Sequence, residues 1–310
     1  MVQPSGRVVI IGAGMVGSSA AYSIINQNIA REVLLIDIAA ELLASQVLDL
    51  QDSSVFTHTT KVKVADYSDL VDGDIVVITS GSAQRDGMRR LDLLNINAGI
   101  IRSITETIKN TGKKVFIIMV TNPVDILTYI VTKESGLPQS MVMGTGTYLD
   151  TGRLQLVLAE KLQVNPTNIS AFVFGEHGDS SFPVLGGATL AGVKLENALT
   201  LDDILYEELA KQVRDRAYEI IKGKKSTHFG IGAAVASMAR MIIRDENRII
   251  PLSALLDGHY GHSDVCAGVT ARLGASGYKI STEIELTEKE KELFQNSVTI
   301  LKDKYSEMSL

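Results

Sequence analysis

The stretch that decides the fold is Arg7-Val8-Val9-Ile10-Ile11-Gly12-Ala13-Gly14-Met15-Val16-Gly17, an apolar run that ends in three spaced glycines. The run predicts a strand buried on both faces of a parallel sheet. Gly12 permits a tight turn, Gly14 lets the backbone approach a pyrophosphate, and Gly17 lets the next helix pack closely on the strand. That helix, over 18–26, would offer free N–H groups and the positive end of its dipole to the phosphates.

A second strand and an acidic residue extend this pattern. Glu32–Ile36 is another apolar run, and Asp37 follows it twenty residues after Gly17. A carboxylate at this place can accept a hydrogen bond from a ribose 2′-hydroxyl. No arginine follows directly to receive a 2′-phosphate, since residues 38–40 are isoleucine and two alanines. The sequence therefore predicts NAD rather than NADP as the cofactor.

Strands and helices alternate through the rest of the first half. Apolar runs over 75–79 and 115–120 are separated by a helical stretch over 91–109, and 141–143 follow as a last strand. This order predicts an α/β fold of the Rossmann type, a doubly wound parallel sheet, over residues 1–144. The turns after the strands, Ser80-Gly81-Ser82 and Thr121-Asn122-Pro123, should line the ligand site, because ligands bind beyond the carboxyl ends of such strands.

Composition and charge exclude several classes of protein. The chain has 310 residues, 45% of them hydrophobic, and no apolar run long enough to span a membrane. A net charge of −6 argues against a nucleic-acid partner, which needs a basic surface. Cys266 is the only cysteine, so we expect neither an intramolecular disulfide nor a cysteine-based zinc site. With its first strand at Arg7 leaving no room for a secretory signal, we expect a cytoplasmic protein without a metal.

The second half, residues 145–310, is expected to form an α+β substrate-binding domain. In Gly175-Glu176-His177-Gly178-Asp179-Ser180, a histidine stands between glycines that leave the backbone open to a small ligand. By itself this segment is either catalytic or an ordinary loop. Asp150 and Arg153 begin a helix over 150–162 and can point from one of its faces, as a surface ion pair or as part of a site.

The remaining elements of the second half look like scaffold. Helices are predicted over 201–222 and 231–243, antiparallel strands over 248–252 and 267–273, and a terminal helix opens with a capping box from Thr287 to Glu290. The other four histidines lack comparable surroundings and are expected to be non-catalytic; they are His58, His228, His259 and His262.

Taken together, these motifs resemble the lactate/malate dehydrogenase family over essentially the whole chain. The resemblance is carried by Gly12–Gly17, Asp37, Gly81–Arg90, Thr121-Asn122-Pro123, Leu149–Arg153 and Gly175–Ser180, in the order and spacing of the family. It implies an NAD-dependent 2-hydroxy acid dehydrogenase, which transfers a hydride between the nicotinamide ring and C2 of a 2-oxo or 2-hydroxy acid.

The resemblance also implies a role for each candidate site residue. His177 would be the acid and base, with Asp150 on its other ring nitrogen. Arg153 would hold the substrate carboxylate in a two-pronged ion pair. Arg90, in a lid over 82–92, would polarise the carbonyl, and Asn122 would add a hydrogen bond near that oxygen.

Two sets of binding residues follow from the same resemblance. The substrate contacts would be Gln84, Arg90, Asn122, Arg153 and Thr227. The cofactor contacts would be Gly12, Gly14, Met15, Val16, Gly17, Asp37, Tyr67, Gly81, Ser82, Ser103, Val120, Asn122 and Thr145.

The substrate depends on Gln84, six residues before the lid arginine. Malate enzymes of the family carry arginine there, whereas a neutral amide gives the second carboxylate of oxaloacetate no counter-charge. Glu176 and Thr227 also resemble the lactate branch. Arg85 is the counter-evidence, because a one-residue shift in lid register would bring its guanidinium toward the pocket, so malate stays an alternative. A catalytically inactive binding protein of the same fold is a further alternative, although none of the four catalytic residues is missing.

Regulation and assembly can be predicted only from the resemblance. Relatives activated by fructose 1,6-bisphosphate carry an arginine and a histidine where this chain has Gln155 and Ser170, neither of which can pair with a phosphate. We therefore expect no activation by that sugar phosphate. The family suggests a homotetramer, with a dimer as the fallback.

Overall fold

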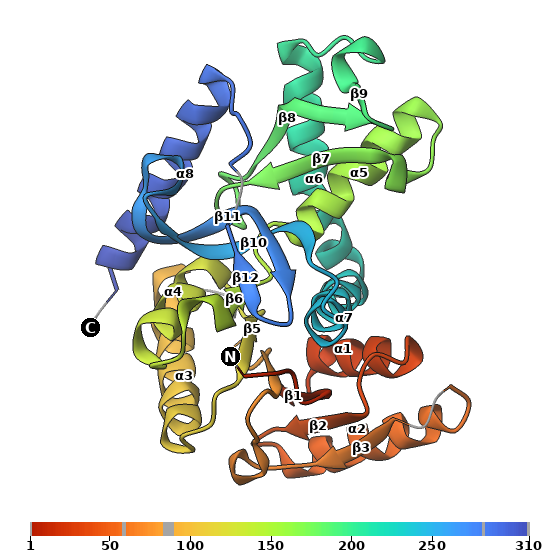
Figure 1. The fold of residues 1–310 in the computed structure, drawn as a ribbon, viewed down its shortest axis with the longest axis vertical. Coiled ribbons are helices and arrows are strands. Elements are labelled where there is room, and N and C mark those ends of the chain that lie inside the picture. Colours follow the sequence, from red (N-terminus) through yellow and green to blue (C-terminus); the bar gives the residue numbers. More distant parts are fainter. Residues whose placement is uncertain (1, 58–59, 83–89, 281–282, 309–310) are drawn as a thin grey trace.

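The structure is a computed structural model that describes residues 2–57, 60–82, 90–280 and 283–308. Its strands form one nine-stranded and one three-stranded sheet within these ranges. Figure 1 shows the large sheet running through the middle of the molecule, with the helices of the first half on both sides of it. None of the helices in the described ranges has the length and apolar character needed to cross a bilayer.

The first half forms the parallel part of the large sheet. Its strands lie in the order β3-β2-β1-β4-β5-β6, which is the Rossmann order read from one edge. The strands are β1 (Arg7–Ile11), β2 (Glu32–Ile36), β3 (Lys61–Val64), β4 (Ile75–Ile78), β5 (Phe116–Met119) and β6 (Val142–Gly144). Strand order reverses between β1 and β4, and ligands of such sheets bind beyond the carboxyl ends of the strands at this reversal. The predicted doubly wound sheet is confirmed.

Four helices connect these strands. They are α1 (Met15–Asn26), α2 (Ala40–Ser54), α3 (Arg90–Asn110) and α4 (Val124–Glu134). Helix α3 packs against α4, and α1 packs against α2. The strands β1, β4 and β5 are almost wholly buried, because helices cover both faces of the sheet. Helix α2, strand β3 and helix α4 were not predicted from the sequence.

The second half continues the large sheet and adds the small one. Strands β10 (Arg248–Asp257), β11 (Ser263–Gly274) and β12 (Gly277–Lys279) join β6 in antiparallel fashion. Strands β7 (Ile169–Phe174), β8 (Phe182–Leu190) and β9 (Val193–Lys194) form the three-stranded sheet. Neither β7 nor β8 was predicted, although the segment that joins them contains the candidate catalytic histidine.

The helices of the second half are α5 (Tyr148–Leu162), α6 (Asp203–Lys224), α7 (Phe229–Ile243) and α8 (Glu288–Ser306). Helix α5 packs on β7, while α7 packs across α1. The predicted capping box of α8 is present, with Thr287 accepting from the Glu290 N–H and the Glu290 carboxylate accepting from the Thr287 N–H. In Figure 1, α8 runs along one side of β10 and β11 and ends near α4.

Candidate active site

The glycine-rich loop has the backbone geometry of a phosphate site. Gly12 has a φ of +109°, and a Cβ at Gly17 would lie 1.9 Å from the Gly12 carbonyl oxygen, so both positions require glycine. By contrast, nothing lies within 4 Å of a Cβ built at Gly14. Gly14 is the N-cap of α1 and no side chain caps the helix. The first N–H groups of α1 therefore have no side-chain cap and can donate to a phosphate.

Asp37 is placed at the end of β2, beside this loop. Its Oδ2 accepts a hydrogen bond from the Ala13 N–H at 2.6 Å, and its Oδ1 accepts one from the Ala39 N–H at 2.8 Å. The half-buried carboxylate thus holds the Gly12–Gly17 loop in place through the Ala13 N–H. This position is compatible with the predicted ribose contact and adds a structural role that the sequence did not indicate.

Most of the other predicted cofactor residues lie at strand ends or on the first turn of α1. Met15 and Val16 open α1, Gly81 and Ser82 follow β4, and Val120 follows β5. Tyr67 follows β3, and Thr145 follows β6 with 3% of its surface exposed. Ser103 differs, because it lies thirteen residues into α3 with an exposed side chain, and no hydrogen bond in the described ranges joins it to the phosphate loop.

The catalytic candidate His177 lies in the loop between β7 and β8. Gly175, at a φ of +90°, closes the loop onto β11 through two hydrogen bonds with Gly268. Helix α5 is tied to β7 by Thr147, which donates to the Val173 carbonyl, and by Thr151, which accepts from the Val173 N–H. These bonds fix the start of α5, and hence Asp150, relative to the histidine loop.

Three predicted residues meet in one small pocket of about 100 Å³. The Asp150 Oδ2 lies 2.6 Å from His177 Nδ1, and the Asp150 Oδ1 accepts a hydrogen bond from Arg153 at 2.9 Å. Asp150 and Arg153 are each 6% exposed, so this is a buried network and not a surface ion pair. The His177 side chain is 27% exposed. With Nδ1 held by Asp150, the other ring nitrogen is the one free to exchange a proton with a ligand.

The network shifts the pKa of both its titrating members. Burial alone would lower the pKa of His177, but the charge and hydrogen bond of Asp150 outweigh it and raise that pKa to about 9. Burial alone would raise the pKa of Asp150, but the charges of His177 and Arg153 hold it below its usual value. The arrangement therefore keeps a proton on the imidazole at neutral pH, beside a buried guanidinium that can bind a carboxylate.

Comparison with known proteins decides the family. The family model of the lactate/malate dehydrogenase NAD-binding domain matches residues 6–144, and that of the α/β C-terminal domain matches residues 147–309. The chain belongs to the lactate/malate dehydrogenase family. As a member of this family it carries an NAD-binding domain, which confirms the predicted cofactor.

Relatives of this family resemble the chain over nearly its full length. It is 42% identical over 298 residues to an L-lactate dehydrogenase of Halalkalibacterium halodurans, with 96% of each chain covered. It is 43% identical over 302 residues to L-lactate dehydrogenase 2 of Enterococcus faecalis, covering 96% of this chain and 95% of that one.

Two solved structures have the same fold. One is a lactate dehydrogenase from a Medee basin deep-sea metagenome library, with a TM-score of 0.95, 36% identity and both chains fully covered (100% of each). The other is the minor L-lactate dehydrogenase of Enterococcus mundtii in a ligand-bound form, with a TM-score of 0.94, 37% identity and 98% of each chain covered.

Not every predicted substrate residue of this dehydrogenase lines the small pocket. Asn122 is exposed after β5, where its carbonyl accepts from the Asn97 side chain at 2.9 Å, and Thr227 is half-buried between α6 and α7. Gln84 and Arg85 lie outside the described residues. Arg90 begins α3, and only its backbone is described.

Some residues of the pocket were missed by the sequence prediction. Helix α6 contributes Arg214, Ala217 and Tyr218, which are spaced three and four residues apart as on one helix face. The Tyr218 hydroxyl donates to Asp179 at 2.8 Å. No sequence pattern pointed to them, because a basic residue and a tyrosine on an amphipathic helix are ordinary surface residues.

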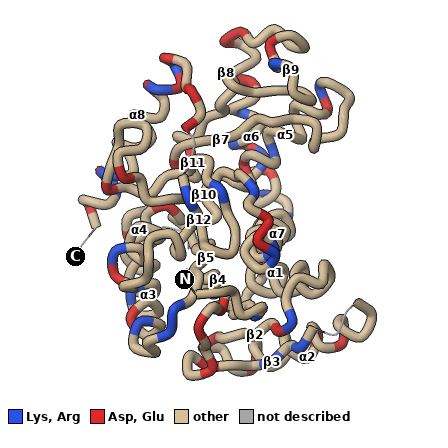
Figure 2. Tube along the Cα trace, in the orientation of Figure 1, with Lys and Arg blue, Asp and Glu red and all other residues tan. Residues whose placement is uncertain are grey.

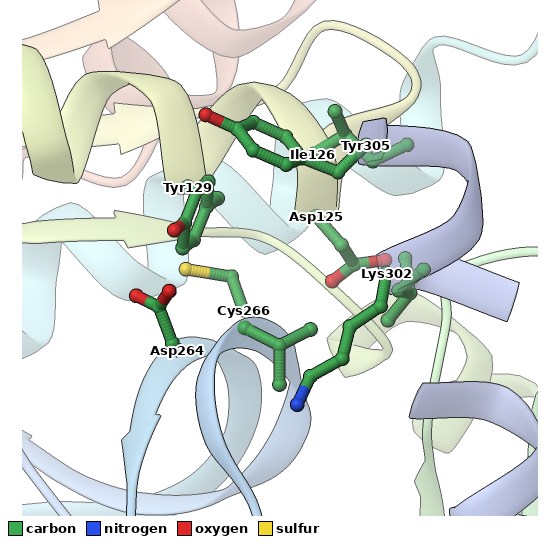
Figure 3. A pocket seen from close by; sticks show the side chains of 9 residues that line it. Asp125, Ile126, Tyr129, Asp264, Cys266, Lys302 and Tyr305 are labelled. Carbon is green, nitrogen blue, oxygen red and sulfur yellow. The ribbon is translucent and has the colours of Figure 1, made fainter. Parts of the chain in front are cut away.

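Asp125, on α4, is a second carboxylate that contacts the histidine loop, and it was also missed. Its Oδ2 accepts the backbone N–H of His177 at 2.7 Å, and burial raises the pKa of Asp125 to about 6. Asp125 also lines a cavity of about 220 Å³ between α4, β11 and α8, together with Cys266 and Tyr129 (Figure 3). An acidic residue at the start of the apolar stretch 124–131 was the available signal.

Charged residues elsewhere do not form an obvious second site. Figure 2 shows acidic and basic residues interspersed along the described part of the chain. Within the described ranges there is no group of three or more histidine, cysteine, aspartate or glutamate side chains that could hold a metal ion.

Proposed function

We propose that this protein catalyses the NAD-dependent interconversion of pyruvate and (S)-lactate, the activity of an L-lactate dehydrogenase. The observation that carries the proposal is the buried His177–Asp150–Arg153 network in one pocket of a chain of this family. The full-length similarity to proteins named L-lactate dehydrogenase supports it.

In this proposal each group of the network acts at one place on the substrate. Arg153 binds the carboxylate of pyruvate and orients C2. His177 gives its proton to the carbonyl oxygen during reduction and removes it during oxidation, with Asp150 keeping Nδ1 protonated. The bound nicotinamide cofactor supplies or accepts the hydride. Arg90 polarises the carbonyl as negative charge develops on its oxygen, and Asn122 donates to the same atom.

In the same proposal, different residues bind different parts of the cofactor. The N–H groups at the start of α1, beside Gly14, bind the pyrophosphate, and Asp37 accepts from the ribose hydroxyls. We further propose that the boundary between the NAD-binding domain and the substrate domain falls between residues 144 and 145. The change from one family model to the other between residues 144 and 147 supports that boundary.

The decisive experiment is a comparison of kcat/KM for pyruvate and for oxaloacetate with NADH. We expect pyruvate to be preferred, because Gln84 offers the second carboxylate of oxaloacetate no counter-charge. The variant Gln84→Arg should move the preference toward oxaloacetate by about tenfold or more, which is what about 1.4 kcal/mol of differential binding gives. A wild-type preference for oxaloacetate would show that the protein is a malate dehydrogenase.

Assembly, compartment and regulation complete the proposal. We propose a cytoplasmic homotetramer, which light scattering would test through its mass. Large apolar side chains exposed on or just after α2, among them Leu48, Val55 and Phe56, support burial against another subunit.

We also propose that fructose 1,6-bisphosphate does not activate the enzyme. Gln155 donates to the Ala171 carbonyl and Ser170 lies exposed on β7, and neither brings a positive charge. A lowered KM for pyruvate on adding the sugar phosphate would contradict this.

A further inference from the structure

The C-terminal helix α8 contacts the catalytic loop at two points. Ser297 and Lys304 are seven residues apart, about two helical turns, and therefore lie on the same face of α8. That face is turned toward the segment that contains His177. The helix is more than 110 residues away from His177 in the sequence, and the active site described above does not include it.

Ser297 is fully buried against the loop that contains the histidine. Its Oγ accepts the N–H of Glu176 at 2.6 Å and lies 3.1 Å from the Ser180 hydroxyl. At Gly175, a Cβ would come within 2.5 Å of the Ser297 Oγ, so the loop backbone lies directly on the helix. One side chain of α8 thus contacts the loop on both sides of His177, at Glu176 and at Ser180.

Lys304 supplies the counter-charge for a buried carboxylate in the same loop. Glu176 is 7% exposed, and its Oε1 forms an ion pair with the Lys304 ammonium. Its Oε2 accepts a hydrogen bond from the Ser180 hydroxyl at 2.6 Å. A buried carboxylate that loses its only cation either takes up a proton or moves toward water. Either response would disturb the residue next to His177.

The opposite side of the loop is fixed by the helices of the candidate active site. Helix α4 holds the His177 N–H through Asp125, and α5 holds the imidazole through Asp150. The loop therefore lies between these two helices and α8. Releasing it on the α8 side would let the imidazole shift relative to Arg153, and misplacement by about 1 Å can cost about a hundredfold in rate.

We propose that Ser297 and Lys304 are positioning residues for His177, holding the imidazole in register with Asp150 and Arg153 through Glu176 without touching the substrate. This inference rests on the proposed function for its kinetic test, but its structural test does not. It assigns a role in catalysis to the C-terminal helix, which the sequence presents only as scaffold.

The groups around the imidazole predict the direction in which the pKa of His177 changes when Lys304 is replaced. The charged and titratable groups that line its pocket or contact its loop are Asp150 and Arg153 from α5, Asp125 from α4, Arg214 and Tyr218 from α6, and Glu176 and Asp179 from the loop itself. Because the charge and hydrogen bond of Asp150 raise the pKa of His177, an imidazole released from its register with Asp150 loses part of that effect. The pKa of His177 should therefore fall in a variant that lacks the Lys304 cation.

The test compares Lys304→Met with Lys304→Arg and with Lys302→Met. Lys302 is the matched control, because it lies on the same helix at the rim of the 220 Å³ cavity and has no ion pair in the described ranges. We expect Lys304→Met to lower kcat/KM for pyruvate about tenfold or more, Lys304→Arg to restore it, and Lys302→Met to leave it unchanged. Ser297→Ala, which removes the acceptor for the Glu176 N–H, should lower kcat/KM as well.

A second readout works without catalysis. The chain has five histidines, so the imidazole signal of His177 can be assigned by NMR against a His177→Asn variant and titrated. In Lys304→Met its midpoint should move to lower pH. If Lys304→Met and Ser297→Ala lower only the melting temperature, and both kcat/KM and the His177 titration stay at wild-type values, α8 is merely structural and the proposal is overturned. Wild-type protein that fails to reduce pyruvate would overturn the proposed function instead.

Discussion

The phosphate loop (Gly12–Gly17) and the catalytic loop (Gly175–Ser180) both contain glycines at tight places, yet they are built differently. The phosphate loop is a strand, a turn and a helix start that follow each other in the chain, and it works through its own backbone N–H groups. The catalytic loop contributes one working side chain, and its other groups come from elsewhere. Asp150, Asp125 and Ser297 reach it from three separate helices.

This difference predicts how the two regions should respond to mutation. A backbone site tolerates side-chain changes unless they fill the space that the ligand needs. An assembled site depends on charges held in a buried network, so changing one partner disturbs the others. The variants below separate the two regions, in order of decreasing effect.

The largest expected effect is that of His177→Asn. Asparagine can occupy the position of the imidazole ring but can neither donate nor remove the proton. The kcat/KM for pyruvate should therefore fall about 10²–10⁴-fold. Affinity for NADH, measured by its fluorescence on binding, should stay at the wild-type value, because the phosphate loop is untouched. Equal loss of cofactor affinity would contradict the separation of the two regions.

Arg153→Lys should have the next largest effect. Lysine keeps the charge but loses the two-pronged geometry, and it leaves the buried Asp150 without its 2.9 Å partner. We expect the KM for pyruvate to rise about tenfold to a hundredfold, the range that loss of one charged hydrogen bond gives. Steady-state kinetics at saturating NADH would measure this, and a change confined to kcat would argue against carboxylate binding by Arg153.

Two alanine variants divide the phosphate loop itself. Gly14→Ala meets no atom of the protein, so the fold should be unaffected while the Kd for NADH rises about tenfold, since the new methyl occupies the path of the pyrophosphate. Gly17→Ala collides with the Gly12 carbonyl and should lower the stability by about 1–3 kcal/mol. Thermal unfolding and NADH titration of both variants would test this, and the reverse pattern would contradict it.

The smallest expected effect is the pH dependence of the unmodified protein. The pKa of His177 is raised to about 9, and pyruvate reduction needs the protonated imidazole. Its kcat/KM should therefore be retained below pH 9 and fall above it, while kcat/KM for lactate oxidation should rise with pH up to the same point. Profiles in both directions would measure this. Half-heights near pH 6.5 would mean that Asp150 does not raise the pKa.

Features that depend on neighbouring residues were predicted correctly from the sequence. The strand–glycine–helix pattern at Gly12–Gly17 sets backbone conformation within a few residues, so its geometry follows from local sterics. The capping box of α8 is equally local. Strands β7 and β8 were missed, since register shifts interrupt their pairing and only part of each alternates between buried and exposed residues.

The candidate site shows the same limit. Asp150 and Arg153 were readable as a pair because three residues separate them on one helix. The sequence did not predict whether that pair is buried or exposed. Its burial is what distinguishes a site from a surface ion pair. Asp125 offered only the signal of an acidic residue at the start of an apolar stretch, and Arg214 offered none, because each acquires a role only where its helix packs.

The sequence by itself determined the alternation of strands and helices, the phosphate loop and the preference for NAD, whereas the acid and base, His177, was identified through the resemblance to the family. The first three depend on residue types at short spacing, which sterics and hydrogen bonding act on directly. Only the tertiary structure decided that α4, α5 and α8 close around one loop and that the Asp150 network is buried. Those facts arise from packing between distant segments, where the low dielectric of the interior makes each charge depend on the partner that the fold supplies.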